Sequence, residues 1–157
     1  MPAKIIKEFL DQNNIKYLSI KHSRAFTAQE IAASAHIHGK RIAKTVILKV
    51  DGNLIFAVLP ATYKVNLDML KEELGAEKIR LANEQEFKDK CPGCEVGAMP
   101  PMGNLFNIET YVAASLVEDE EIAFNAGTHT ELIKMNYNDY EKIVKPKVLR
   151  FSAKYKT

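Results

Sequence analysis

Both cysteines of the chain lie in one short stretch, CPGCEVGAMPPMGNLF, which spans residues 91–106. Cys91 and Cys94 have the Cys-x-x-Cys spacing that can bind a metal ion or form a redox-active pair. The same stretch continues into glycines and prolines, which is typical of a rigid loop that shapes a pocket. The three interpretations predict different chemistry and depend on different residues elsewhere in the chain.

A metal site at the cysteine pair would need further ligands, because a structural zinc ion takes four Cys or His ligands. None of the histidines follows Cys94 at zinc-finger spacing; they are His22, His36, His38 and His129. A redox pair normally lies at a helix N-terminus, but two prolines within seven residues of Cys94 prevent a long helix there. We therefore expect no metal ion. The metal and the redox interpretations both require the two cysteines and have no support from other residues.

Gly97, Gly103, Pro100 and Pro101 favour the loop interpretation. Proline fixes φ and glycine permits backbone conformations that other residues avoid, so the segment is rigid in one part and permissive in another. Such a loop can present backbone N–H groups to a ligand with little conformational entropy left to lose on binding. A tight connection between two elements would use the same residues, and that alternative stays open.

Lys44 lies inside an apolar run, IAKTVIL, that reads as a strand. Strand alternation places Ile42, Lys44, Val46 and Leu48 on one face and the intervening residues on the other. We therefore expect the Lys44 ammonium to emerge from an apolar wall into a cleft. The alternative is a lysine at a strand end whose charged group simply extends into solvent.

A second glycine-containing turn is expected in FNAGTHTE, residues 124–131. Gly127, Thr128 and His129 would lie there between two strands. A histidine in such a turn can bind a ligand, and a buried, hydrogen-bonded histidine is the alternative.

The elements that must position these residues are a mixture of helices and strands. The strongest signal is RIAKTVILKV-DG-NLIFAVL, in which two β-rich runs flank an Asp-Gly turn and predict a hairpin. Thr27 and Glu30 form a capping box that opens a helix ending near Gly39. Further helices are expected from Pro2 to the QNN at 12–14, over 66–75, from 83 and over 138–144; strands are expected over 16–22, 41–50, 53–59, 109–113, 121–126 and 130–135. We expect a single α+β domain over residues 1–157, with a mixed, mostly antiparallel sheet that curls into a partial barrel flanked by helices.

Composition is that of a soluble globular protein, with 46% hydrophobic and 27% charged residues in a chain of 157. No apolar run approaches the roughly 20 residues that cross a bilayer, and the N-terminus becomes charged before a signal-peptide core could form, so a cytoplasmic protein with no membrane partner is expected. The charge is uneven: residues 1–66 carry ten Lys or Arg against four acids, and the chain from Lys142 onward adds six basic residues and no acid. This imbalance permits a polyanionic ligand on one face.

Three motifs, AKTVILKVDG, VGAMPPMG and FNAGTHTELIKM, in this order and at these separations, resemble the YbaK/EbsC family of aminoacyl-tRNA deacylases. That family is related to the editing domain inserted in bacterial prolyl-tRNA synthetases. The resemblance covers nearly the whole chain. It implies a trans-editing hydrolase that removes a wrongly attached amino acid from tRNA-Pro or a similar tRNA by hydrolysing the ester to the terminal adenosine, without a cofactor.

The resemblance also implies roles for individual residues. Catalytic positions are Lys44, Gly97 and Gly127; substrate-binding positions are Ala98, Met99, Pro100, Pro101, Asn125, Thr128 and His129. The uneven charge adds tRNA-binding positions: the basic first third, with Lys40, Arg41 and Lys64, and the chain beyond Lys142 are expected to contact the acceptor-stem backbone. The cysteine pair is no part of the family's shared chemistry. The implied partners are a mischarged aminoacyl-tRNA and an aminoacyl-tRNA synthetase, with no DNA.

Such chemistry suits these residue types, because an aminoacyl ester is already activated and needs a placed water and fixed oxyanion donors rather than a strong nucleophile. Backbone N–H groups of a Gly/Pro loop can be those donors, and Lys44 suits the terminal phosphate or the polarised ester. No residue is an obvious general base, and the family is thought to use substrate hydroxyl groups and bound water. Two alternatives stay open: a non-catalytic module that binds tRNA or a synthetase, and a redox or metal protein built on the cysteines.

Overall fold

The computed structural model describes residues 2–22, 42–118 and 120–154. Its first element is helix α1, Pro2–Gln12, which buries Ile6 and Leu10 on one side. Proline suits the first turn of a helix because its missing N–H would have no partner there. The helix ends as expected in the asparagine pair, where Asn14 adopts a φ of 57°.

The Asp-Gly hairpin is confirmed. Strands β2, Ala43–Val50, and β3, Asn53–Pro60, pair antiparallel with Val50 opposite Asn53. The two turn residues, Asp51 and Gly52, both have positive φ, 47° and 87°. A two-residue hairpin turn with positive φ at both positions matches the right-handed twist of the strands, which is why Asp-Gly favours it.

The hairpin is the centre of a five-stranded sheet with the order β5-β2-β3-β6-β9. The added strands are β5, Ile79–Leu81, β6, Glu109–Ala113, and β9, Lys147–Leu149. β5 pairs antiparallel with β2, whereas β6 pairs parallel with β3 and β9 pairs parallel with β6. The sheet is therefore mixed, as predicted.

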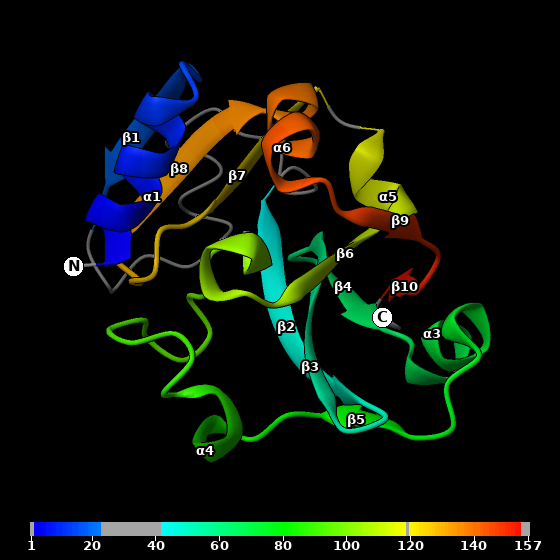
Figure 1. The fold of residues 1–157 in the computed structure, drawn as a ribbon. Helices are drawn as coiled ribbons and strands as arrows, with labels where there is room; N and C mark the ends of the chain where they lie inside the picture. Colours follow the sequence, from blue (N-terminus) through cyan, green and yellow to red (C-terminus); the bar gives the residue numbers. More distant parts are fainter. Residues whose placement is uncertain (1, 23–41, 119, 155–157) are drawn as a thin grey trace.

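A three-stranded antiparallel sheet has the order β1-β8-β7, with β1, Tyr17–Lys21, β7, Glu121–Asn125, and β8, Glu131–Asn136. A parallel bridge between Ile42 and Ala123 connects it to the start of β2 (Figure 1). Two short strands, β4, Tyr63–Val65, and β10, Ser152–Lys154, pair separately. The α+β class and the mostly antiparallel pairing are confirmed. The described strand pairings close no barrel, and the partial barrel stays a prediction.

Helix signals in the sequence also hold where the structure describes them. Asn66 caps α3, Leu67–Leu74, and Gly75 ends it with a φ of 62°. Asn83 and Glu86 form the capping box of α4, Glu84–Phe87. A further short helix is α5, Ala114–Val117, and the last is α6, Tyr137–Val144. The capping box at Thr27 and the helix expected up to Gly39 lie outside the described residues.

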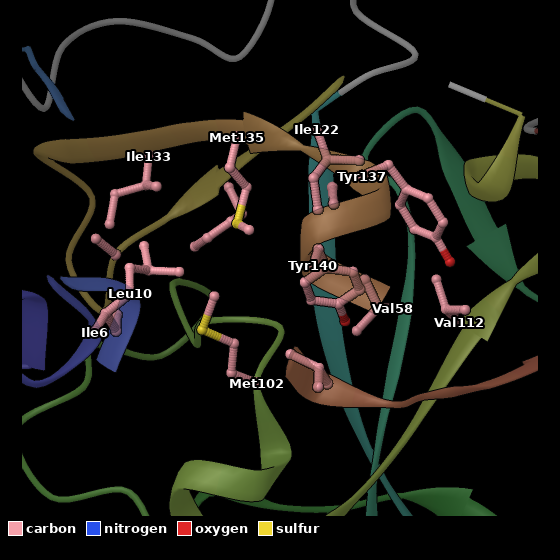
Figure 2. Close-up of a cluster of buried hydrophobic side chains, with 14 of the residues drawn as sticks. Ile6, Leu10, Val58, Met102, Val112, Ile122, Ile133, Met135, Tyr137 and Tyr140 are labelled. Carbon is pink, nitrogen blue, oxygen red and sulfur yellow. The ribbon is translucent and has the colours of Figure 1, made fainter. Parts of the chain in front are cut away.

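The largest hydrophobic cluster joins α1, α6 and the β7–β8 pair. Met102, which follows the glycine–proline loop, is fully buried in it (Figure 2). Figure 2 shows Met102 beside Ile6 and Leu10 of α1 and Tyr140 of α6. This core therefore fixes the C-terminal end of the loop. None of the helices in the described ranges combines the length and apolarity needed to cross a bilayer.

Candidate functional site

The glycine–proline loop begins with a tight turn over residues 95–98. The Ala98 amide donates to the Glu95 carbonyl at 3.0 Å. Gly97, the third residue of this turn, has a φ of 84°. A type II turn requires positive φ at that position, so glycine is the residue that adopts it without strain.

The second glycine loop, residues 125–130, contacts the first one directly. Gly127 donates its amide hydrogen to the Ala98 carbonyl at 2.9 Å and accepts from the Glu95 amide at 2.8 Å. Gly127 has a φ of 85°. Two loops that are about 30 residues apart in sequence are thus joined through one residue that uses both of its backbone polar groups.

His129 adds side-chain contacts to the same junction. Its Nε2 lies 2.8 Å from the Val96 carbonyl, and its amide donates to Glu95 Oε2 at 3.2 Å. Because a carbonyl can only accept, Nε2 must carry the proton in this contact. A base role for the ring is therefore left to Nδ1. The ring also lies over Gly97, where an added Cβ would be 3.4 Å from Cε1.

The side chains at positions 98–101 of the loop point into the protein. Ala98 is fully buried and Met99 nearly so, and Met99 packs in a cluster with Ile47 and Phe56. The Pro101 carbonyl accepts a hydrogen bond from the buried Tyr140 hydroxyl at 2.6 Å. With its side chains anchored in this way, the loop offers a ligand mainly backbone atoms.

The hydrogen bonds narrow the choice of oxyanion donors. The amides of Ala98 and Gly127 are already used in the junction, and the two prolines have no N–H. Among the described residues, nothing accepts from the amides of Gly97 and Met99. Within residues 97–101, these two amides are therefore the backbone donors that stay available to a ligand.

Lys44 is the second residue of β2 and is half-buried. It lies two residues beyond the bridge at Ile42, just as Asn125 lies two residues beyond the bridge at Ala123. The bridge is parallel, so both chains leave it in the same direction. Strand alternation then gives Lys44 and Asn125 the same side of their respective strands. This register is consistent with a shared site at the second loop.

The remaining candidates are Lys64, Lys40, Arg41 and Thr128. Lys64 is exposed on β4, opposite Ala153 of β10. Lys40 and Arg41 lie outside the described residues. Thr128 is half-buried within the second loop, where its hydroxyl is 3.2 Å from that of Thr130.

The cysteines lack the properties of a reactive pair. Cys91 is buried and Cys94 is half-buried, and both are free thiols. Burial, followed by the neighbouring Cys94, raises the pKa of the Cys91 thiol to about 12, and burial also raises the pKa of Cys94. Thiols with such pKa values are protonated at neutral pH and are poor nucleophiles. The described residues contain no group of three or more metal-ligating side chains.

Glu95 was not expected as a site residue from the sequence. Its backbone and carboxylate make three of the hydrogen bonds at the junction. The local signal is its position at the start of a turn whose third residue is glycine, and this signal does not reveal a partner more than 30 residues away.

Comparisons with known proteins found similar sequences and a similar fold. The sequence model of the family described as "Aminoacyl-tRNA editing domain" matches residues 22–143. The chain is 32% identical over 114 residues to the Multifunctional Ser/Thr-tRNA deacylase ProXp-y of Escherichia coli K12, covering 69% of this chain and 68% of that protein. It is 30% identical over 104 residues to a proline–tRNA ligase of Bacillus mycoides, covering 64% of this chain and 18% of the ligase. In fold, it resembles a crystal structure of a candidate trans-editing enzyme for prolyl tRNA synthetase, with a TM-score of 0.83, 17% identity and 97% of both chains covered.

Proposed function

Because the chain belongs to the aminoacyl-tRNA editing domain family, we propose that it is a trans-editing hydrolase. It removes a wrongly attached amino acid from a tRNA by hydrolysing the aminoacyl ester. The observation that carries the proposal is the match to a Ser/Thr-tRNA deacylase over 69% of the chain. The junction of two glycine loops supports it, because it presents backbone donors without a nucleophilic side chain. We infer one editing domain over residues 1–157, and the bridge between its two larger sheets supports a partial barrel.

The chemistry proceeds by direct attack of water on the ester carbonyl. The amides of Gly97 and Met99 stabilise the oxyanion, and each such donor contributes on the order of 10²-fold in rate. Lys44 supplies a fixed positive charge for the terminal phosphate or the polarised ester. Gly127 acts indirectly, since its own amide holds the Ala98 carbonyl and so fixes the turn that carries Gly97.

Proton transfer is left to the substrate and to water. A hydroxyl of the terminal ribose and a bound water relay the proton of the attacking water to the ribose oxygen that leaves when the ester bond breaks. Nε2 of His129 takes no part, because it donates to the Val96 carbonyl. His129 and Asn125 then border the substrate rather than activate the water. Side chains of Ala98, Met99, Pro100 and Pro101 shape the wall behind the loop's backbone.

The substrates and partners follow from the relatives. Serine or threonine attached to the wrong tRNA is the first candidate substrate, since one relative is named for both. A second relative is a proline–tRNA ligase, so tRNA-Pro is the first tRNA to test and a prolyl-tRNA synthetase is the first protein partner. A protein with these substrates works in the cytoplasm, where tRNAs are charged.

A deacylation assay tests the proposal. Purified protein is incubated with tRNA-Pro and other tRNAs charged with serine, threonine or another small amino acid, and the remaining ester is measured over time. We expect hydrolysis of at least one mischarged tRNA and no hydrolysis of the correctly charged pair. Binding of tRNA without hydrolysis of any ester would instead support a non-catalytic module.

A further inference from the structure

Two neighbouring hollows lie along the C-terminal end of α6. One, of about 490 Å³, is lined by Asn13, Ile15, Lys142, Ile143 and Lys145. The other, of about 360 Å³, is lined by Asn104, Asn107, Ile108, Glu109, Thr110, Val144, Lys145 and Lys147. Lys145 borders both. Figure 1 shows α6 between α1 and β9. Asn13 and Ile15 directly follow α1, Lys147 belongs to β9, and residues 104–110 supply the rest of the second wall.

The charge of this surface is positive. Lys142, Lys145 and Lys147 are all exposed. Glu109 is the one carboxylate that lines either hollow, and it is paired with Lys147 at 3.0 Å. Within the described ranges, no acid lies in ion-pair contact with Lys142 or Lys145. Two cations are therefore available to an anionic ligand.

Lys145 has an unusual backbone conformation for its residue type. It is the C-terminal cap of α6 with a φ of 53° and a ψ of 54°, in the left-handed region that glycine or asparagine adopts with least strain. A strained residue kept at a helix end indicates a use for its side chain. The simpler explanation for Lys145 is that a basic side chain at the C-terminus stabilises the helix through its dipole, and the experiment must separate this effect from ligand binding.

The lysine surface along α6 is built on the same elements that hold the glycine–proline loop. Asn104 comes three residues after Pro101, so the two α-carbons are within about 11 Å. Its side chain also contacts the Ile143 carbonyl at 3.5 Å. α6 itself holds Pro101 through the Tyr140 hydroxyl. A nucleic acid whose end enters the site would therefore continue close to this surface.

We propose that Lys142, Lys145 and Lys147 form a binding surface for the RNA backbone, which receives the tRNA stem beyond the esterified end. Lysine and asparagine side chains are common partners of phosphate and sugar oxygens, and Asn13, Asn104 and Asn107 supply the amides. This assignment rests on the proposed function for the identity of the RNA. It narrows the sequence expectation, in which the basic first third, with Lys40, Arg41 and Lys64, and the chain beyond Lys142 both contact the acceptor-stem backbone. Lys64 lines neither hollow.

The test compares two double variants of equal charge. K142Q/K145N removes the two unpaired cations and places at 145 a residue that tolerates left-handed backbone. K71Q/K78Q removes two exposed lysines elsewhere. Binding of uncharged tRNA is measured by fluorescence anisotropy at several salt concentrations. We expect K142Q/K145N to weaken binding about 10-fold and to reduce the log–log salt slope by about 1–2, whereas K71Q/K78Q changes neither.

Two further measurements make the outcomes distinct. The melting temperatures of K142Q/K145N and wild type are compared, because a lost helix contribution lowers the melting temperature whereas lost RNA binding alone does not. Deacylation of mischarged tRNA is compared with that of an aminoacyl ester of adenosine, which lacks a stem, and K142Q/K145N should lower the ratio of the two kcat/KM values. Equal tRNA binding by K142Q/K145N and wild type, or equal weakening by both double variants, overturns the proposal. Weakened binding in a protein that hydrolyses neither ester supports this surface while contradicting the enzymatic function.

Discussion

At the scale of single residues, Glu95 holds the two glycine loops together. Its amide donates to Gly127, its carbonyl accepts from Ala98, and its carboxylate accepts from the His129 amide. Only the last of these depends on the side chain. In the proposed mechanism Glu95 is therefore a positioning residue, because its hydrogen bonds fix the turn whose amides bind the oxyanion.

Replacing Glu95 with alanine should lower kcat for deacylation by about 10-fold, which corresponds to about 1.4 kcal/mol, and should change KM less. The loss arises because the second loop, no longer held by the carboxylate, lets the turn move away from the productive position. Glu95→Gln keeps an acceptor and should recover part of the rate. An alanine variant with wild-type kcat, or one whose melting temperature falls as steeply as its activity, would contradict a positioning role.

The cysteines should be dispensable. Cys91→Ala/Cys94→Ala is expected to keep deacylation within about twofold of wild type, because both thiols are protonated and neither makes a hydrogen bond of the loop junction. Wild-type protein should react slowly with iodoacetamide at pH 7.5, since the pKa of Cys91 is raised to about 12. One zinc ion per chain in elemental analysis, or loss of activity in the double variant, would restore the metal or redox interpretation.

At the scale of elements, the sequence predicted what local chemistry determines. The Asp51-Gly52 turn specifies its hairpin, and Asn66 and Asn83 cap the helices that they were expected to cap. The short strands β4, β5, β9 and β10 were missed, because three residues carry too little periodicity and their partners are distant in sequence. The loop junction was missed for the same reason, since its hydrogen bonds join backbone atoms about 30 residues apart. Residue types and strand alternation singled out Lys44 and both glycine loops, and the family resemblance supplied their expected roles.

The 3₁₀ turn Gly103–Phe106 links the glycine–proline loop to β6, and Gly103 has no room for a side chain. A Cβ there would lie 2.3 Å from the Ile108 carbonyl oxygen and 2.5 Å from Thr110 Oγ1. Gly103→Ala should therefore destabilise the fold by about 1–3 kcal/mol in urea unfolding and reduce deacylation. Gly75→Ala is the control: it is strained by a φ of 62° but has open space, so it should lose stability and keep its kcat. If the two variants had equal kcat values, the conformation of this turn would not affect the site, and the prediction would be contradicted.

Glu131 connects α1, β1 and β8 through Lys7 and Ser19. Burial alone would raise its pKa, but hydrogen bonds from Lys7 and Ser19 and the charges of Lys7 and Lys21 outweigh burial and hold the pKa below its usual 4.5. A depressed pKa contributes stability that is complete above the unfolded-state value and is lost as pH falls through the folded one. At pH 7 the free energy of unfolding in urea should be about 1–2 kcal/mol higher for wild type than for Glu131→Gln. This difference should shrink below about pH 4.5. A constant difference from pH 7 to pH 3 would show that the ion pair does not cause it.

At the scale of the whole molecule, two sheets meet at the Ile42–Ala123 bridge, and each carries part of the proposed site. The five-stranded sheet carries Lys44, and the three-stranded sheet carries the second glycine loop. The first glycine loop arrives from outside both sheets and is anchored by α6 through Pro101. The cation, the backbone donors and the loop junction therefore come from three parts of the chain, which explains why no single segment of the sequence contains the site.

The most direct test of this account is the deacylation of a mischarged tRNA by wild type, Lys44→Ala and Lys49→Ala. Lys49 is the matched control, because it lies on the same strand and the opposite face and is paired with Glu86 at 2.8 Å. We expect wild type and Lys49→Ala to hydrolyse the ester at similar rates, and Lys44→Ala to be slower by about 100-fold or more, with a melting temperature within a few degrees of wild type. Full activity of Lys44→Ala, or no hydrolysis by wild type of any mischarged tRNA, would contradict the account.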